Sequence, residues 1–296
     1  MTKRQTPLLG AHMSMQGGVH RAIERGVGLG CTALQLFTRN NVQWRATPLT
    51  EAHCQAFRSV WGASGIGPIV AHANYLIDLA SADERVVRLS LDGLIVELQR
   101  AAALGLRWVV LHPGCHQGAG DEQGLRQVAE LVRRAFDATA GLPAGLLLET
   151  TAGQGTSLGW RFEHLAWLLD AIGEPARLGV CFDTCHVFAA GYDLRDEASY
   201  AATMAEFDRV VGLRRIHAFH VNDSKRELGS RVDRHAHIGR GRLGLAAFRC
   251  LMRDPRFAAV PKLIETPKAD AERDDWDAVN LGKLRRLARE QIRGST

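Results

Sequence analysis

The sequence lacks the features of membrane, secreted and disordered proteins. No run approaches the roughly 20 apolar residues that a membrane helix needs. The six cysteines form no CxxC pair, and the N-terminal stretch has no apolar segment of the secretory type. Proline and glycine, at 9 and 30 of 296 residues, are too few for a disordered chain. We therefore expect a cytoplasmic protein with free thiols and no membrane partner.

Length and charge indicate the domain organisation of the protein and the kind of partner that it binds. Lys plus Arg (37) exceed Asp plus Glu (32), which gives a formal net charge of +5. This mild basic excess suits a polyanionic partner, although an arginine-rich surface without such a partner has the same charge. At 46% hydrophobic residues, the chain can bury the core of one large domain spanning residues 1–296.

Eight short apolar runs alternate with amphipathic stretches along the chain. Each run is nearly continuous in apolar character at its start, which is typical of a strand buried in a parallel sheet. Eight such units predict an α/β fold, a closed (β/α)₈ TIM barrel, and the strand count argues against a doubly wound open sheet. The predicted strands are Leu8–Ser14, Ala33–Phe37, Ile69–Ala73, Trp108–Gly114, Gly145–Thr150, Leu178–Thr184, Ile216–Asp223 and Pro261–Thr266.

Helical patterns follow the strands, and glycines mark three of the expected helix ends. Gly105, Gly141 and Gly173 stand where C-caps are expected. Residues 224–242 form the longest irregular stretch, and a loop of this length is often functional. The clearest helices are expected at Ala82–Leu104, Glu122–Ala140, Phe162–Ile172, Glu197–Val211 and Trp276–Glu290.

Candidate metal ligands cluster at the C-terminal ends of the predicted strands. In a barrel these ends form one rim, so the side chains are expected to converge there. Four carboxylates would repel one another in a common cleft unless divalent cations were present, and imidazole with carboxylate is a typical zinc ligand set. Nine ligands suit three ions, or two with a looser outer shell. The candidates are His72, His112, Glu149, Asp183, His186, His220, Asp233, His235 and Glu265.

Three longer motifs resemble the endonuclease IV family of apurinic/apyrimidinic endonucleases. They are LETTAGQG at residues 148–155, VCFDTCHVFAAGYD at 180–193 and HVNDSKRELGSRVDRHAHIGRGRLG at 220–244. The similarity extends over nearly the whole chain, from GAHMSMQGG to LIETP, and the motifs occur in the family's order. The resemblance assigns His72, His112 and Glu149 to a first zinc, Glu149, Asp183, His220 and Glu265 to a second, and His186, Asp233 and His235 to a third.

The resemblance also implies a reaction. It is hydrolysis of the phosphodiester on the 5′ side of an abasic site in double-stranded DNA, leaving 3′-hydroxyl and 5′-deoxyribose phosphate ends. Trimming of blocked 3′ ends, a catalytic role for Glu149 and a monomeric enzyme are further expectations. Manganese is compatible with one of the three zinc positions.

Loop residues resemble the family's DNA contacts. Tyr75 and Leu76 are expected to wedge into the base stack, and His12 to line the pocket. Val42 stands where some relatives carry a basic residue, while Asp78 and Cys115 replace an expected amide and serine. Phosphate contacts are expected from Arg39, Asn40, Lys225, Arg226, Arg231 and Arg234.

Three alternative interpretations remain open. A metal-dependent sugar isomerase or epimerase has a similar barrel but needs one or two metals and no wedge. A non-catalytic DNA-binding barrel would not need the complete ligand set. Cys181 and Cys185 flank Asp183 and could compete for zinc, although we favour a packing role for both.

Overall fold

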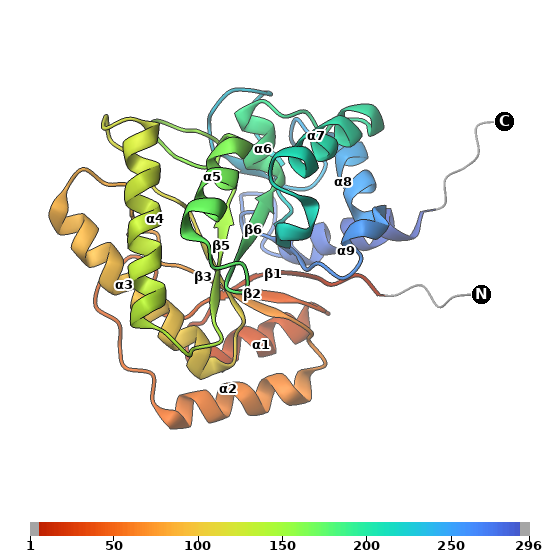
Figure 1. Ribbon diagram of the computed structural model, residues 1–296. Coiled ribbons are helices and arrows are strands. Elements are labelled where there is room, and N and C mark those ends of the chain that lie inside the picture. The colour runs from red at the N-terminus through yellow and green to blue at the C-terminus, as the bar shows by residue number, and fades with distance from the viewer. Residues whose placement is uncertain (1–5, 291–296) are drawn as a thin grey trace.

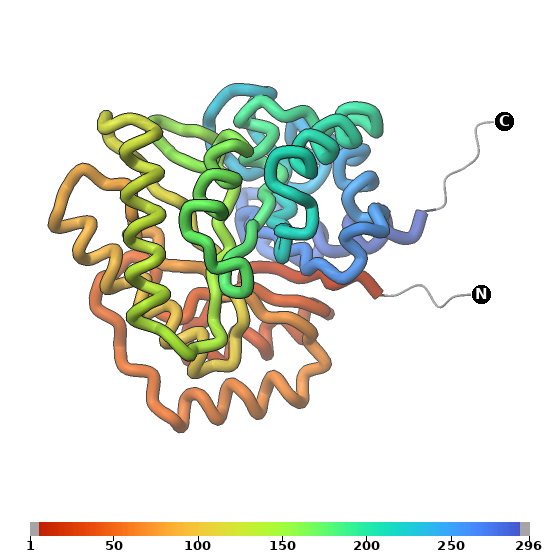
Figure 2. Tube along the Cα trace, in the orientation of Figure 1, coloured from red at the N-terminus to blue at the C-terminus, as the bar shows by residue number. Residues whose placement is uncertain are grey.

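Eight parallel strands close into a barrel in the computed structural model, which describes residues 6–290 (Figure 1). The order round the barrel is β1, β10, β7, β6, β5, β4, β3 and β2, so the first and last strands of the chain pair and close it (Figure 2). The barrel strands are β1 (Leu9–Met13), β2 (Leu34–Phe37), β3 (Ile69–His72), β4 (Trp108–Leu111), β5 (Gly145–Glu149), β6 (Leu178–Asp183), β7 (Ile216–His220) and β10 (Lys262–Ile264).

The barrel and its eight predicted strands are confirmed, and each observed strand lies inside its predicted range. A layer of small and branched side chains fills the barrel interior, as is usual when every strand is buried on both faces. Gly10 of β1 is required beside the start of the neighbouring strand β2, because a Cβ there would lie 1.8 Å from the carbonyl oxygen of Ala33. The interior residues are Ala33, Val70, Val110, Leu147, Cys181, Ala218 and Leu263.

Helices cover the outside of the barrel (Figure 1). Gly105 and Gly173 end their helices in the left-handed conformation, as predicted. The prediction for Gly141 was wrong, because its helix ends at Ala138 with Thr139 as the C-cap. The helices are α1 (Val19–Gly28), α2 (Glu51–Ser64), α3 (Glu84–Leu104), α4 (Asp121–Ala138), α5 (Phe162–Ile172), α6 (Thr184–Ala190), α7 (Glu197–Val210), α8 (Gly244–Arg253) and α9 (Trp276–Arg289).

The long stretch 224–242 is more ordered than its composition suggested. Its first residue belongs to β8 (Asp223–Ser224), which pairs antiparallel with β9 (His235–Ala236) inside the stretch. The buried Asp223 carboxylate accepts hydrogen bonds from the backbone N–H groups of Ser224, Gly239, Gly241 and Leu243. These bonds tie both ends of the stretch to one acidic side chain, which fixes the path of the segment carrying Asp233 and His235.

No helix among residues 6–290 is long and apolar enough to cross a bilayer.

The end of the barrel opposite the C-terminal ends of the strands carries a buried lysine, Lys262. Its ammonium donates hydrogen bonds to the carbonyl oxygens of Phe257 and Val260 and lies 5.9 Å from the centre of the Phe219 ring. Burial lowers the pKa of Lys262 from 10.5 to about 8. The unfolded chain therefore binds one more proton than the folded chain between these two pH values.

We expect the free energy of unfolding to rise as the pH increases from about 8 to about 10, by at most roughly 1.4 kcal/mol per unit. Lys262→Met should remove this rise, because methionine does not titrate. Denaturant unfolding at three pH values measures it, with the exposed Lys225→Met as the control. An unchanged slope in Lys262→Met would contradict the assignment.

Candidate metal centre

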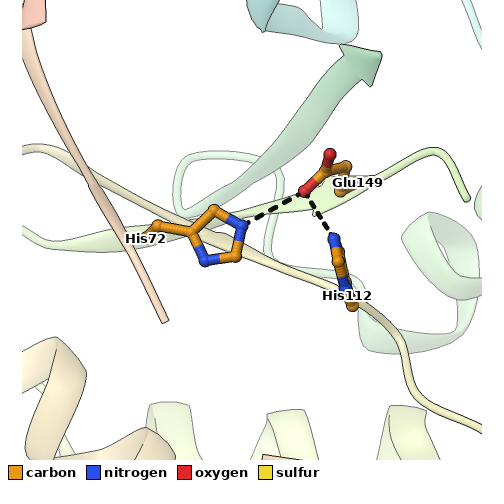
Figure 3. A group of neighbouring side chains, drawn as sticks. All are labelled: His72, His112 and Glu149. Atoms are coloured by element: carbon orange, nitrogen blue, oxygen red, sulfur yellow. Dashed lines mark ion pairs between the residues drawn. The ribbon is translucent and has the colours of Figure 1, made fainter. Parts of the chain in front are cut away.

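All nine predicted ligands lie at the end of the barrel formed by the C-terminal ends of the strands, which we call the mouth. The carboxylate of Glu149, at the end of β5, is fully buried at its centre. One of its oxygens, Oε2, faces Nε2 of His72 at 3.4 Å and Nε2 of His112 at 3.0 Å (Figure 3). These three side chains can hold one metal ion.

A second cluster shares Glu149 with the first. The other carboxylate oxygen of Glu149 lies 2.8 Å from Nδ1 of His220. Glu265, which follows β10, places an oxygen 3.2 Å from the same nitrogen, and Asp183 completes the group. The ligands come from the ends of β5, β6, β7 and β10, which are neighbours in the barrel wall, so the pairing of these four strands brings the cluster together.

The third cluster joins the strand ends to the long loop. Oδ2 of Asp233 lies 3.1 Å from Nε2 of His186, and Oδ1 lies 3.3 Å from Nε2 of His235. Asp183 also lies within ligand reach of His186 and His235, so it belongs to two clusters, as Glu149 does. Cys185 could bind with Asp233 and His235 on geometry alone, but burial raises the pKa of its thiol to about 12. This pKa favours the packing role for Cys185.

Asp183, at the junction of β6 and α6, both caps a helix and lies among the candidate metal ligands. It is the N-cap of α6, and its Oδ1 accepts a hydrogen bond from the backbone N–H of His186 at 2.8 Å. This bond fixes the backbone at His186, and a second bond from its Nδ1 to the carbonyl oxygen of Thr150 directs Nε2 toward Asp233. The second oxygen stays directed toward His220 and His235. Capping and metal binding are therefore compatible, because a carboxylate has two oxygens.

Three of the histidines present a bare ring nitrogen to the carboxylates. His72 donates from Nδ1 to the carbonyl of Ala73, His186 from Nδ1 to that of Thr150, and His220 from Nε2 to Oε1 of Gln35. The remaining nitrogen of each ring then faces acidic oxygens. A ring nitrogen without a proton and a carboxylate oxygen are both hydrogen-bond acceptors. At such short distances they repel each other unless a proton or a cation lies between them.

The electrostatics of the site point to the same need for positive charge. Burial alone would lower the pKa of His220, but the neighbouring Cys181, Glu149 and Glu265 raise it well above its ordinary value. Burial alone would raise the pKa of Glu149, yet His220 and His112 lower it well below its usual range. Oε2 of Glu149 and Nε2 of His235 are buried without a hydrogen-bond partner. These observations fit a site built for divalent cations.

Two polar residues that hold the ligands were missed by the sequence analysis. The amide nitrogen of Gln35 donates to Glu265 at 2.6 Å and to His12 at 2.9 Å, while its oxygen holds His220. Asn222 donates to Asp183 and accepts from the backbone N–H of Glu265. One signal was available for Gln35, since it is the only polar residue in the predicted strand Ala33–Phe37.

The structure corrects the expected role of Arg39. Its side chain is buried, with the residue 3% exposed, and its Nε donates to Glu97 of α3 at 2.7 Å. It is therefore not available to a DNA phosphate. Tyr75 is 54% exposed beside the mouth, Leu76 is half-buried, and His12 is half-buried with its pKa lowered to about 4 by burial. The other predicted phosphate contacts are exposed: Asn40, Lys225, Arg226, Arg231 and Arg234.

None of the three departures is itself a candidate ligand, but Cys115 lines one pocket together with His112, His186 and Asp233. Val42 is 65% exposed. Asp78 accepts hydrogen bonds from the backbone N–H groups of Ala80 and Cys115, which closes the loop after β3 against the loop after β4. An acid in place of the expected amide can still accept both bonds.

Comparison with known proteins agrees with this geometry. A family model described as xylose isomerase-like TIM barrel matches residues 23–288. The probable endonuclease 4 of Geobacter sp. (strain M21) is 49% identical over 280 residues, which covers 95% of this chain and 98% of that protein. The structure of endonuclease IV from Thermus thermophilus superposes with a TM-score of 0.84 at 38% identity, covering 95% and 98% of the two chains.

A sugar epimerase shares only the fold. D-psicose 3-epimerase from Clostridium cellulolyticum superposes with a TM-score of 0.64 at 12% identity, covering 95% of each chain. Such a likeness reflects the barrel and carries no statement about the substrate. The matches to the endonucleases cover a similar share of the chain at far higher sequence identity, 49% and 38%, and the chain belongs to the endonuclease IV family of the xylose isomerase-like TIM barrels.

Proposed function

We propose that this protein is a DNA-repair endonuclease that hydrolyses the phosphodiester on the 5′ side of abasic sites in duplex DNA. The products are 3′-hydroxyl and 5′-deoxyribose phosphate ends, and blocked 3′ ends are trimmed at the same site. The observation that carries the proposal is the complete set of nine ligand side chains, which lie in adjoining clusters at one mouth. Three zinc ions per chain fit this set, with manganese acceptable at one position.

Charge favours a phosphodiester over a sugar at this site. Three divalent ions would contribute about +6 against about −4 from the four carboxylates, which leaves a positive pocket floor. When bound, such ions activate water near neutral pH and stabilise the charge that develops on the phosphate oxygens. The chain itself supplies the spacing of the ions, because Glu149 and Asp183 each belong to two clusters.

The protein also has to recognise the abasic site. Tyr75 lies beside the mouth, next to the rings of His72 and His112, and Leu76 follows it. Both are suited to enter the base stack, at a cost of a few kcal/mol that a bent duplex offsets through further contacts. Extrusion of the sugar costs least where no base pair is lost. Exposed Lys225, Arg231 and Arg234 lie on the long loop and can contact phosphates without reading sequence.

One experiment tests the reaction. The zinc-loaded protein should nick a duplex oligonucleotide with a single abasic site in buffer free of magnesium and chelator, and elemental analysis should find three equivalents of metal per chain. An undamaged duplex of the same sequence is the control substrate. Absence of nicking would refute the function, and one or two equivalents of metal would favour the isomerase or epimerase interpretation.

We also propose that the enzyme acts as a monomer, because one mouth and its loops are sufficient to bind one damaged site. Its proposed location is the cytoplasm.

A further inference from the structure

A buried carboxylate lies beneath the two loops that follow β2 and β3. Glu97 of α3 is 1% exposed. Its Oε1 accepts hydrogen bonds from Nε of Arg39 at 2.7 Å and from the backbone N–H of Asn74 at 3.2 Å, and its Oε2 accepts one from the hydroxyl of Thr38 at 2.7 Å. One helix residue therefore binds the start of the loop 38–49 and the start of the loop 73–83.

Arg39 and Asn74 extend this contact across the first loop. Nη1 of Arg39 donates to the carbonyl oxygens of Trp44 at 2.9 Å and Gln43 at 3.2 Å. Nδ2 of Asn74 donates to the carbonyl oxygens of Asn40 at 2.8 Å and Gln43 at 2.9 Å. The loop 38–49 has no regular structure of its own, so these inward bonds define its shape, together with those that Arg100 of α3 donates to the carbonyl oxygens of Thr38 and Thr47.

The same network reaches the residues proposed to wedge into DNA. Oδ1 of Asn74 accepts a hydrogen bond from the backbone N–H of Leu76 at 2.7 Å. The Tyr75 ring packs edge-on against Phe37, with centroids 5.2 Å apart, and tilted against His72 at 5.3 Å. One side of Tyr75 is thus exposed, and the other side packs against Phe37 and His72, whose positions are fixed by the barrel strands.

We propose that Glu97 is a positioning residue for abasic-site recognition. Acting through Arg39 and Asn74, it joins the two loops into one rigid unit and presents Tyr75 and Leu76 in their binding conformation. A wedge that is ordered before binding loses little conformational entropy when it enters the base stack, so more of its contact energy is retained as affinity. This role rests on the proposed function, since it has a purpose only if the substrate is a damaged duplex.

Two variants separate positioning from simple stability. Asn74→Ala removes the bonds to the first loop and to Leu76 without leaving a buried charge unpaired, and Glu97→Gln keeps the side-chain shape but removes the charge. We expect each variant to raise the KM for an abasic duplex about tenfold and to change kcat by less than about twofold. Hydrolysis of bis(p-nitrophenyl) phosphate, which is too small to reach both loops, should be unchanged. Tyr75→Ala serves as the reference for complete loss of the wedge.

Two control variants test whether the loss of a charge, or a loss of stability, is enough by itself to change KM. Glu130→Gln removes an exposed carboxylate on α4, and Val132→Ala truncates a buried side chain of the same helix, so neither should change KM. Should Glu97→Gln fail to fold, Arg39→Lys keeps the buried charge but cannot span Glu97 and the two carbonyls, and it should raise KM in the same way. An unchanged KM in folded Asn74→Ala, or equal losses on both substrates, would overturn the positioning role. Nicking by the wild-type protein tests the proposed function separately.

Discussion

Replacing Glu149 with glutamine is expected to lower kcat on an abasic duplex by at least about a thousandfold. Glu149 is fully buried, and its two oxygens face different clusters, with His72 and His112 on one side and His220 on the other. Glutamine keeps the shape but has only one oxygen and no charge. It can therefore no longer join the two clusters through a carboxylate.

Steady-state cleavage of the abasic duplex measures this loss, and elemental analysis shows whether metal is lost with it. Circular dichroism should show an intact fold, because the barrel core does not depend on the charge. The matched control is Glu130→Gln, which changes an exposed glutamate of α4 and should keep full activity. Activity near the wild-type level in Glu149→Gln would exclude the bridging role.

Gln35→Leu is expected to weaken metal binding by about tenfold to a hundredfold, the usual effect of removing a partner that orients a ligand. The Gln35 amide holds Nε2 of His220, which directs Nδ1 toward Glu149, and also donates to Glu265, so one side chain orients two ligands from different parts of the barrel. Leucine fills a similar volume but can neither donate nor accept a hydrogen bond. His220 and Glu265 would then lose their fixed orientation.

Competition with a chromophoric zinc chelator measures the affinity directly, without reference to activity. Gln55→Leu, at an exposed position on α2, is the control and should bind metal as the wild-type protein does. If Gln35→Leu retained wild-type affinity at every equivalent of zinc, the orienting role of Gln35 would be wrong.

The barrel could be predicted from sequence because its strands carry a local signal. A strand buried on both faces must be apolar throughout most of its length, as at Ile69–His72 and Gly145–Glu149, and this pattern needs no knowledge of the partner strand. The ends of the helices were harder to predict from the sequence. The turn after α4 begins with Thr139, two residues before the glycine that was expected to cap the helix.

Arg39 shows where the sequence was insufficient. A basic residue in a loop usually lies in solvent, and nothing near it in the chain indicates otherwise. Its partner Glu97 is 58 residues away on α3, so only the packing of that helix under the loop turned a predicted phosphate contact into an internal ion pair.

The sequence by itself determined the strands, their alternation with helices, and the positions of nine ligand side chains at the strand ends and on one loop. The tertiary structure alone decided which ligands share an ion, which ring nitrogen each histidine presents, and which loop residues stay exposed. The physical reason is that backbone periodicity is local, whereas clusters such as Glu149 with His220 join atoms of residues 71 positions apart. Such distances are set only when the strands pair, here β5 with β6 and β6 with β7.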